Sequence, residues 1–120
     1  MARVLLVDDE SEALKIVLPS VGKKKGHEVI IANNGRQGLE ALSQNPDIIF
    51  CDFEMPEMDG HRFTEEIRTN PEYEKHSKIP IIGIGSFPED MREHLTEFLQ
   101  KPILYTKILE IVDKYCRKID

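Results

Sequence analysis

The chain has 120 residues, of which 40% are hydrophobic and 32% are charged, and its formal net charge at pH 7 is −6. These values are typical of one soluble globular domain, and the acidic balance argues against a protein that binds nucleic-acid phosphates. The apolar run Val4–Val7 ends at acidic residues and is too short for a signal peptide or a membrane-spanning helix. We therefore expect a single cytoplasmic domain over residues 1–120, without nucleic-acid or membrane partners.

Short apolar runs alternate with helical patterns along the chain. Runs rich in Val and Ile and bounded by polar residues, Gly or Pro suit strands that are buried on both faces of a parallel sheet. The runs are Val4–Val7, Val29–Ala32, Ile48–Cys51 and Ile79–Ile84, with a weaker and shorter fifth candidate at Glu97–Leu99.

The first helical pattern follows the first run, and its apolar residues fall on one helix face: Leu14, Val17, Leu18 and Val21. Pro19 lies inside this pattern, and it removes a backbone donor and crowds the preceding turn. The sequence therefore predicts a kink or a break there. Gly26 follows three lysines and is a predicted helix end.

Three later segments also have helical character. Asn33–Gly35 is expected to open a helix that stops at Asn45-Pro46, Phe63 and Ile67 mark another, and the last spans roughly Tyr105–Ile119. Strands alternating with helices predict a doubly wound α/β domain with right-handed crossovers.

In such a fold, functional residues gather at the carboxyl ends of the strands. The first run is followed by Asp8 and Asp9, the third by Asp52, the fourth by Gly85-Ser86 and the fifth by Lys101. We expect three carboxylates, a hydroxyl and an ammonium group to meet at one edge of the sheet.

This set of groups favours phosphoryl chemistry. Neighbouring carboxylates repel one another, and Mg²⁺, which prefers carboxylate and phosphate oxygens, would relieve the conflict. Asp52 is then a candidate nucleophile that attacks phosphorus, and Lys101 a candidate contact to a phosphate oxygen. A simpler interpretation is that Asp9 or Ser11 only caps the following helix.

At these residues the sequence resembles the receiver domains of two-component response regulators. The matching stretches cover nearly the whole chain in order: Val4–Asp9, Ala32–Gly35, Glu40–Leu42, Asp52–Gly60, Ile79–Ile82 and Lys101-Pro102. The stretch Asp52–Gly60 is highly specific.

The resemblance implies a flavodoxin-like sheet of five parallel strands in the order 2-1-3-4-5, with helices on both faces. It implies that Asp52 accepts a phosphoryl group from a histidine kinase, a histidine phosphotransfer protein or a small donor. By position, Mg²⁺ would be held by Asp8, Asp9, Asp52 and the backbone carbonyl of Glu54. Lys101 would contact the phosphoryl group, and its bond to Pro102 would be cis. Such a domain is a phosphoacceptor that switches a surface for a downstream protein or effector domain, rather than an enzyme acting on a separate substrate, although it can catalyse its own phosphorylation and dephosphorylation.

The chain departs from the family pattern after the fourth strand. Receivers usually place Thr or Ser there, and the alignment puts Gly85 at that position. Ser86 is a candidate substitute for the switch hydroxyl, but Ser86–Glu89 also matches a capping box with Ser86 as the N-cap.

The segment between Gly85 and Lys101 is also shorter than in ordinary receivers. A helix within Pro88–Thr96 must be short or displaced, and Phe98 falls where the family has a switch aromatic residue. Leu104 replaces the polar cap that usually starts the last helix.

The histidines and cysteines carry no recognisable motif. The four histidines share no spacing typical of a metal site and are predicted surface residues: His27, His61, His76 and His94. Cys51 and Cys116 form no CxxC pattern, which favours a reduced chain without disulfides.

Three hypotheses follow from these observations. The first is a phosphoacceptor receiver, based on Asp8, Asp9, Asp52 and Lys101. The second is a pseudo-receiver, a protein-interaction module independent of phosphorylation, based on Gly85 and the short segment. The third is an aspartate phosphatase, for which Glu54 matches the usual second acid only loosely and for which 120 residues leave no room for a substrate-binding cap domain.

Overall fold

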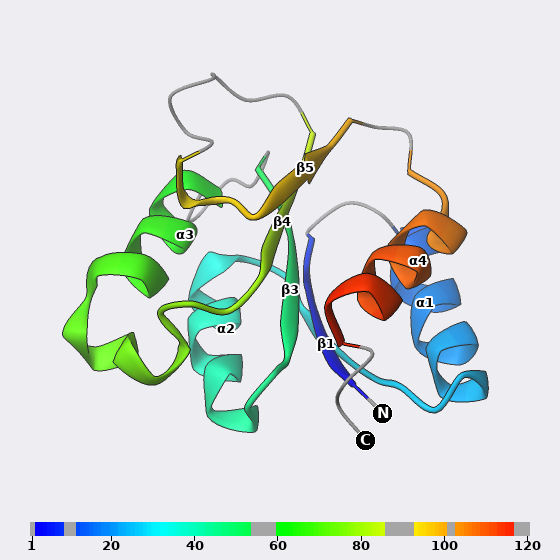
Figure 1. Ribbon diagram of the computed structural model, residues 1–120. Helices are drawn as coiled ribbons and strands as arrows, with labels where there is room; N and C mark the ends of the chain where they lie inside the picture. The colour runs from blue at the N-terminus through cyan, green and yellow to red at the C-terminus, as the bar shows by residue number, and fades with distance from the viewer. Residues whose placement is uncertain (1, 9–11, 54–59, 86–92, 101–102, 117–120) are drawn as a thin grey trace.

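The computed structural model describes residues 2–8, 12–53, 60–85, 93–100 and 103–116. Five parallel strands form one sheet in the order β2-β1-β3-β4-β5, and helices cover both of its faces (Figure 1). The predicted doubly wound α/β fold and its strand order are therefore confirmed. The strands are β1 (Arg3–Val7), β2 (Glu28–Ala32), β3 (Ile48–Asp52), β4 (Ile81–Ile84) and β5 (Glu97–Leu99).

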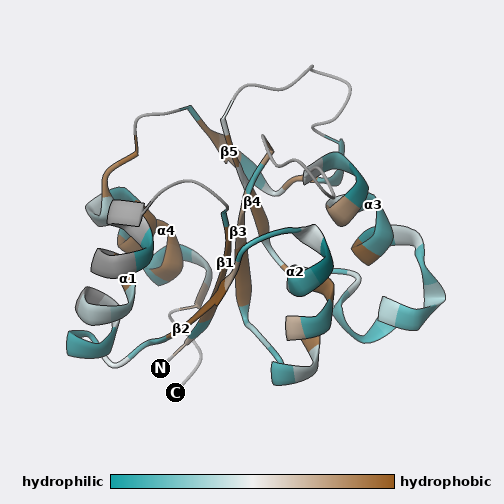
Figure 2. Cartoon of the chain, turned by 180° about the vertical axis from the view of Figure 1, so that it is seen from behind, coloured by the Kyte–Doolittle hydropathy of each residue, from teal (hydrophilic) through white to brown (hydrophobic). Residues whose placement is uncertain are grey.

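The described helices are α1 (Glu12–Lys24), α2 (Gly35–Ala41), α3 (Gly60–Thr69) and α4 (Tyr105–Cys116), with short 3₁₀ helices η1 (Leu42–Gln44) and η2 (Pro71–His76). Side chains alternate along each strand and so enter two separate apolar layers. Leu6 and Phe50 pack with residues of α1 and α4, whereas Leu5 and Ile49 pack with residues of α2 and α3. Figure 2 shows the apolar strands between the more polar outer faces of the helices.

Helix α1 runs without a break from Glu12 to Lys24 although Pro19 lies inside it. Of the kink or break predicted at Pro19, the break does not occur, because a helix continues wherever tertiary packing outweighs the loss of one hydrogen bond. The predicted end is confirmed. Gly26 has φ = +81°, its N–H donates to Lys23 O, and the N–H of His27 donates to Gly22 O. This pair of bonds is a Schellman motif, which favours glycine at its left-handed position.

The other element boundaries follow from local chemistry. The Asn34 side chain accepts a hydrogen bond from the Gln37 N–H and caps α2, as the sequence predicts. Strand β4 begins at Ile81 rather than at the predicted Ile79. Pro80 has no N–H to donate to a neighbouring strand, although its carbonyl still accepts a hydrogen bond from the Ile49 N–H.

Two predictions reach beyond the described residues. The last helix is described as far as Cys116, so the predicted extension to Ile119 lies outside. Most of the segment Pro88–Thr96 also lies outside, and only residues 93–96 of it are described.

Candidate functional site

Two aspartates lie side by side at the carboxyl ends of the two central strands. Val7 of β1 is paired with Cys51 of β3, so the residues that follow them, Asp8 and Asp52, occupy the next position in register. The N–H of Asp8 donates to Ala32 O at the end of β2, which fixes the backbone where β1 ends. The strand register thus brings the backbones of Asp8 and Asp52 to the same edge of the sheet.

Both carboxylates are shielded from bulk water. Asp8 is 1% exposed and Asp52 is 0% exposed. A buried carboxylate loses much of its hydration and is stabilised by hydrogen bonds or by a cation close to it. Two such groups with oxygen donors only fit a hard divalent cation such as Mg²⁺ better than a softer metal ion.

Phe53, the residue after Asp52, is held against two glycines. A Cβ atom on Gly60 would lie 2.5 Å from Phe53 Cδ1 and 2.9 Å from its Cα. A Cβ atom on Gly83 of β4 would lie 3.2 Å from Phe53 Cε1 and 2.7 Å from Leu95 Cδ1. The N–H of Phe53 also donates to Ile84 O. The absence of side chains at these two glycines lets Phe53 fix the backbone immediately after Asp52.

The end of β4 brings Gly85 to the same edge of the sheet. Asp52 is paired with Ile84, and Gly85 follows directly, with φ = +110° and its N–H donating to Leu99 O. This backbone conformation favours glycine. The structure thus places a residue without a side-chain donor beside the position of Asp52, as the sequence alignment predicts.

The remaining predicted site residues cannot be placed. Asp9, Glu54, Ser86 and Lys101-Pro102 lie outside the described residues. Their predicted roles as a metal ligand, a carbonyl ligand, a switch hydroxyl and a phosphoryl contact therefore stay predictions.

Phe98 lies on β5, the edge strand, with 41% of its surface exposed. Its neighbours along the strand turn to the other face, where Leu99 packs into the layer of α1 and α4 and Glu97 contacts α4. Leu104 and Tyr105, at the start of α4, are 71% and 40% exposed. The β5–α4 side of the molecule therefore presents large apolar side chains to solvent.

Comparison with known proteins decides the family. The family model described as the response regulator receiver domain matches residues 4–113. This chain belongs to the response regulator receiver domain family. Its place is therefore in two-component signalling.

Individual relatives differ greatly in length. The receiver domain is 30% identical to Protein PilH of Pseudomonas aeruginosa, in an alignment covering 94% of this chain and 96% of PilH. It is 36% identical to the Sensor histidine kinase CheAY of Helicobacter pylori over 82% of this chain, but that alignment spans only 13% of the kinase. Receiver domains of this sequence type thus occur both in short proteins and within long ones.

Solved structures agree with the fold. The chemotaxis protein CheY4 of Vibrio cholerae superimposes with a TM-score of 0.78 at 26% identity, covering 96% of this chain and 98% of that one. The response regulator TrrA of Thermotoga maritima, solved in complex with Mg²⁺ and BeF, gives a TM-score of 0.76 at 28% identity, covering 96% and 99%. Within the part of this chain that the structure describes, no helix is long and apolar enough to cross a membrane.

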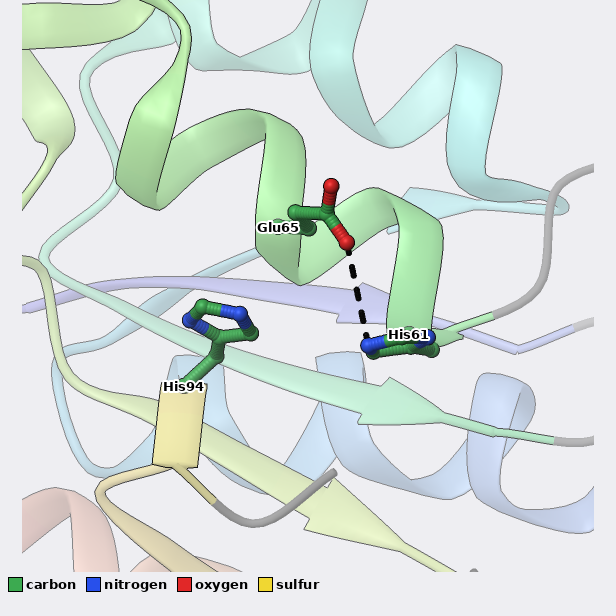
Figure 3. Close-up of side chains that lie close together, drawn as sticks. All are labelled: His61, Glu65 and His94. Carbon is green, nitrogen blue, oxygen red and sulfur yellow. Dashed lines mark ion pairs between the residues drawn. The ribbon is translucent and has the colours of Figure 1, made fainter. Parts of the chain in front are cut away.

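One grouping in the structure was not predicted from the sequence. His61 and Glu65 of α3 come close to His94, which precedes β5 (Figure 3). The side chains of His61 and His94 are 36% and 17% exposed, so His61 fits the predicted surface position better than His94. The four-residue spacing of His61 and Glu65 predicts that the two side chains share one face of a helix. No pattern in the sequence around His94 predicts that it lies close to them.

Proposed function

We propose that this receiver domain accepts a phosphoryl group on Asp52 in a Mg²⁺-dependent reaction. The observation that carries the proposal is that two buried aspartates, Asp8 and Asp52, directly follow the paired residues Val7 and Cys51 at the carboxyl ends of the neighbouring strands β1 and β3. The complex of the relative TrrA with Mg²⁺ and BeF supports the choice of metal. The donor is a histidine kinase, a histidine phosphotransfer protein or a small phosphorylated compound.

The chemistry would be a direct transfer between two nucleophiles. A carboxylate oxygen of Asp52 attacks phosphorus while the bond from phosphorus to the donor nitrogen or oxygen breaks, and the donor keeps that electron pair. Asp8, Asp9, Asp52 and the Glu54 carbonyl would hold Mg²⁺, which when bound neutralises charge on the phosphoryl oxygens. Lys101 would contact one of those oxygens as a point charge.

The fixed backbone around Asp52 supports this role. The nucleophile of a phosphoryl transfer must stand in line with the leaving group, and positioning accounts for much of the rate. The hydrogen bond from Phe53 to Ile84 and the packing of its ring on Gly60 and Gly83 limit movement of the strand end. The site is thus organised before a donor arrives.

The test is intact-mass spectrometry after incubation with acetyl phosphate and Mg²⁺. We expect an adduct of one phosphoryl group in the wild-type chain and none in Asp52→Asn or after addition of EDTA. Asp113→Asn, which removes an exposed carboxylate from α4, is the matched control and should be labelled like the wild type. An adduct that persists in Asp52→Asn would show that another group is the acceptor.

A second candidate function is favoured by Gly85. A glycine at the end of β4 offers no side-chain hydroxyl to a phosphoryl group on Asp52, and Ser86 would have to replace it. If neither phosphorylation nor beryllofluoride changes the amide chemical shifts of residues 83–85 and 93–100, the domain acts as a protein-interaction module independent of phosphorylation. Shifts in those residues would support a working switch and a downstream protein partner that recognises it.

A further inference from the structure

Three metal-ligating side chains meet between α3 and the segment that precedes β5. His61 and Glu65 are one turn apart on α3, and His94 approaches them from the other segment (Figure 3). One ligand atom from each lies within 4.8 Å of the other two. The distance from His61 Nε2 to Glu65 Oε2 is 3.7 Å, and the two imidazole rings are 6.2 Å apart and nearly parallel.

These distances are close to those of a tetrahedral metal site. Ligand atoms at about 2.0–2.1 Å from a zinc ion lie about 3.4 Å from one another. The pair on α3 nearly meets this spacing, because residues four apart share one helix face. The ring of His94 would have to move by up to about 1.4 Å to complete the set, and rotation about its side-chain bonds supplies movements of that size.

The backbone that carries His94 is anchored to the same helix as the other two ligands. Arg68, one turn beyond Glu65, donates from Nε to His94 O at 3.0 Å. Its Nη1 donates to Ser77 O at 2.9 Å and to Ile79 O at 2.7 Å. The guanidinium therefore connects α3 to three backbone carbonyls in two segments. These hydrogen bonds hold the backbone of His94 close to the helix that carries His61 and Glu65.

Accessibility and charge also suit a cation. The side chains of His61, Glu65 and His94 are 36%, 55% and 17% exposed, so an ion can enter from solvent while the ring of His94 is shielded. A second carboxylate, Glu93 Oε1, lies 3.4 Å from His94 Nε2. Two imidazoles beside two carboxylates favour a divalent ion over an anion or a neutral ligand.

We propose that His61, Glu65 and His94 bind a divalent transition-metal ion of the zinc class, with a fourth position left for water. Two nitrogen ligands and one oxygen ligand suit Zn²⁺ or Co²⁺ and are poorly suited to Mg²⁺, so the site is distinct from the aspartates at the strand ends. It lies outside the phosphoryl chemistry proposed above and does not depend on it.

The bound ion would link α3 to the residues that directly precede β5. Leu95 follows His94 directly and lies against Gly83 of β4, and Thr96 Oγ1 accepts a hydrogen bond from the Ile81 N–H. A metal bridge at His94 would therefore hold the connection between the last two strands in one arrangement.

The experiment is a titration of the full chain with Zn²⁺ and Co²⁺ in a millimolar excess of Mg²⁺, which occupies the acidic site with the hard ion. We expect one zinc ion per chain by competition with a chromophoric chelator, and visible Co²⁺ absorption of a four-coordinate site. His61→Ala and His94→Ala should each weaken binding about tenfold or more. His76→Ala, a half-buried histidine outside the cluster, should bind like the wild type.

Two further measurements keep the result interpretable. Glu65→Gln, at a half-exposed position, should weaken binding without affecting the fold, and paramagnetic Co²⁺ should broaden the imidazole signals of His61 and His94 but not those of His27 and His76. The proposal is overturned if the alanine variants bind zinc like the wild type, if zinc at tens of micromolar does not bind, or if sedimentation shows one ion shared between two chains.

Discussion

The ring of Phe53 occupies space that side chains on Gly60 and Gly83 would need. At Gly60 the restriction includes a main-chain atom, because an added Cβ would lie 2.9 Å from Phe53 Cα. A main-chain atom cannot rotate away, so the whole strand end would have to move. The packing of Gly60 and Gly83 against Phe53 therefore affects the backbone position of the preceding residue, Asp52.

We predict that Gly60→Ala lowers the free energy of unfolding by about 1–3 kcal/mol, the usual cost of overpacking a buried site. Gly22→Ala in α1 is the matched control. Its added Cβ would meet the side chain of Val29 at 3.0 Å and two atoms of His27 at an ordinary contact distance of 3.8 Å, and the gain in helix propensity offsets the closer contact. Urea unfolding of both variants provides the measurement, and equal stability of the two would contradict the prediction.

The same substitution tests the link to phosphoryl acceptance. If Phe53 positions Asp52, Gly60→Ala should also slow labelling by acetyl phosphate under conditions where the variant is fully folded. Gly22→Ala should be labelled at the wild-type rate. Normal labelling in folded Gly60→Ala would mean that the packing of Phe53 serves stability alone.

At the scale of elements, β5 is a three-residue edge strand that is fastened to α4 by one carboxylate. Glu97 accepts hydrogen bonds from Lys114 Nζ, at 2.7 Å, and from the Tyr115 hydroxyl. The bond from Lys114, followed by that from Tyr115, lowers the pKa of Glu97 below its usual 4.5. The hydrogen bond to Glu97 raises the pKa of Tyr115 above its usual 10.0.

The lowered pKa of Glu97 predicts a loss of stability in acid. A carboxyl group whose folded-state pKa lies below its unfolded value stabilises the fold fully above about pH 4.5, and the effect is lost as the pH falls through the folded pKa. The side chain of Glu97 is 30% exposed, so we expect a contribution of about 1 kcal/mol.

Urea unfolding of Glu97→Gln between pH 3 and pH 7 measures this contribution. The variant should be less stable than the wild type at pH 7, and the difference should shrink as the pH falls from 4.5 toward 3. Glu110→Gln, an exposed substitution on α4, controls for the loss of one negative charge from this region. A difference between Glu97→Gln and the wild type that does not change with pH would exclude the ionised carboxylate as its source.

At the scale of the whole molecule, the two thiols lie in different apolar layers. Cys51 packs with residues of α2 and α3, and Cys116 packs in the layer of α1 and α4. Both are buried and free of disulfides. Burial, followed by the nearby charges of Asp47 and Asp113, raises the pKa of Cys116 to about 11.

We predict that neither thiol reacts quickly with an aromatic disulfide reagent at pH 8 in the folded protein. With a pKa near 11, only about one Cys116 side chain in a thousand is ionised at pH 8. In urea both thiols should react at the rate of an unfolded chain, and mass mapping would assign each label. Fast labelling of one thiol in buffer would mean that its layer opens independently of the other.

The sequence predicted those parts of the fold that depend on local patterns. The Val- and Ile-rich runs, the Asn34 cap and the Gly26 turn each follow from a few neighbouring residues. The helix continues through Pro19, and no local pattern in the sequence tells whether a proline will end a helix. The position of Asp8 and Asp52 at one sheet edge was predictable because each comes at the end of a buried apolar run. The approach of His94 to His61 depends instead on how Arg68 holds a distant segment to α3, which no spacing in the sequence reveals.

The two apolar layers also determine where the chain tolerates the insertion or deletion of residues. Removing one residue from β3 would move every later side chain of that strand to the opposite face of the sheet, so Cys51 would leave the layer of α2 and α3 for the layer of α1 and α4. The segment between β4 and β5 is not restricted in this way. The pairing of the two strands fixes the positions of its ends, and its number of residues does not change which face a strand side chain occupies. A one-residue deletion between β4 and β5 should therefore cost less stability than a one-residue deletion inside β3.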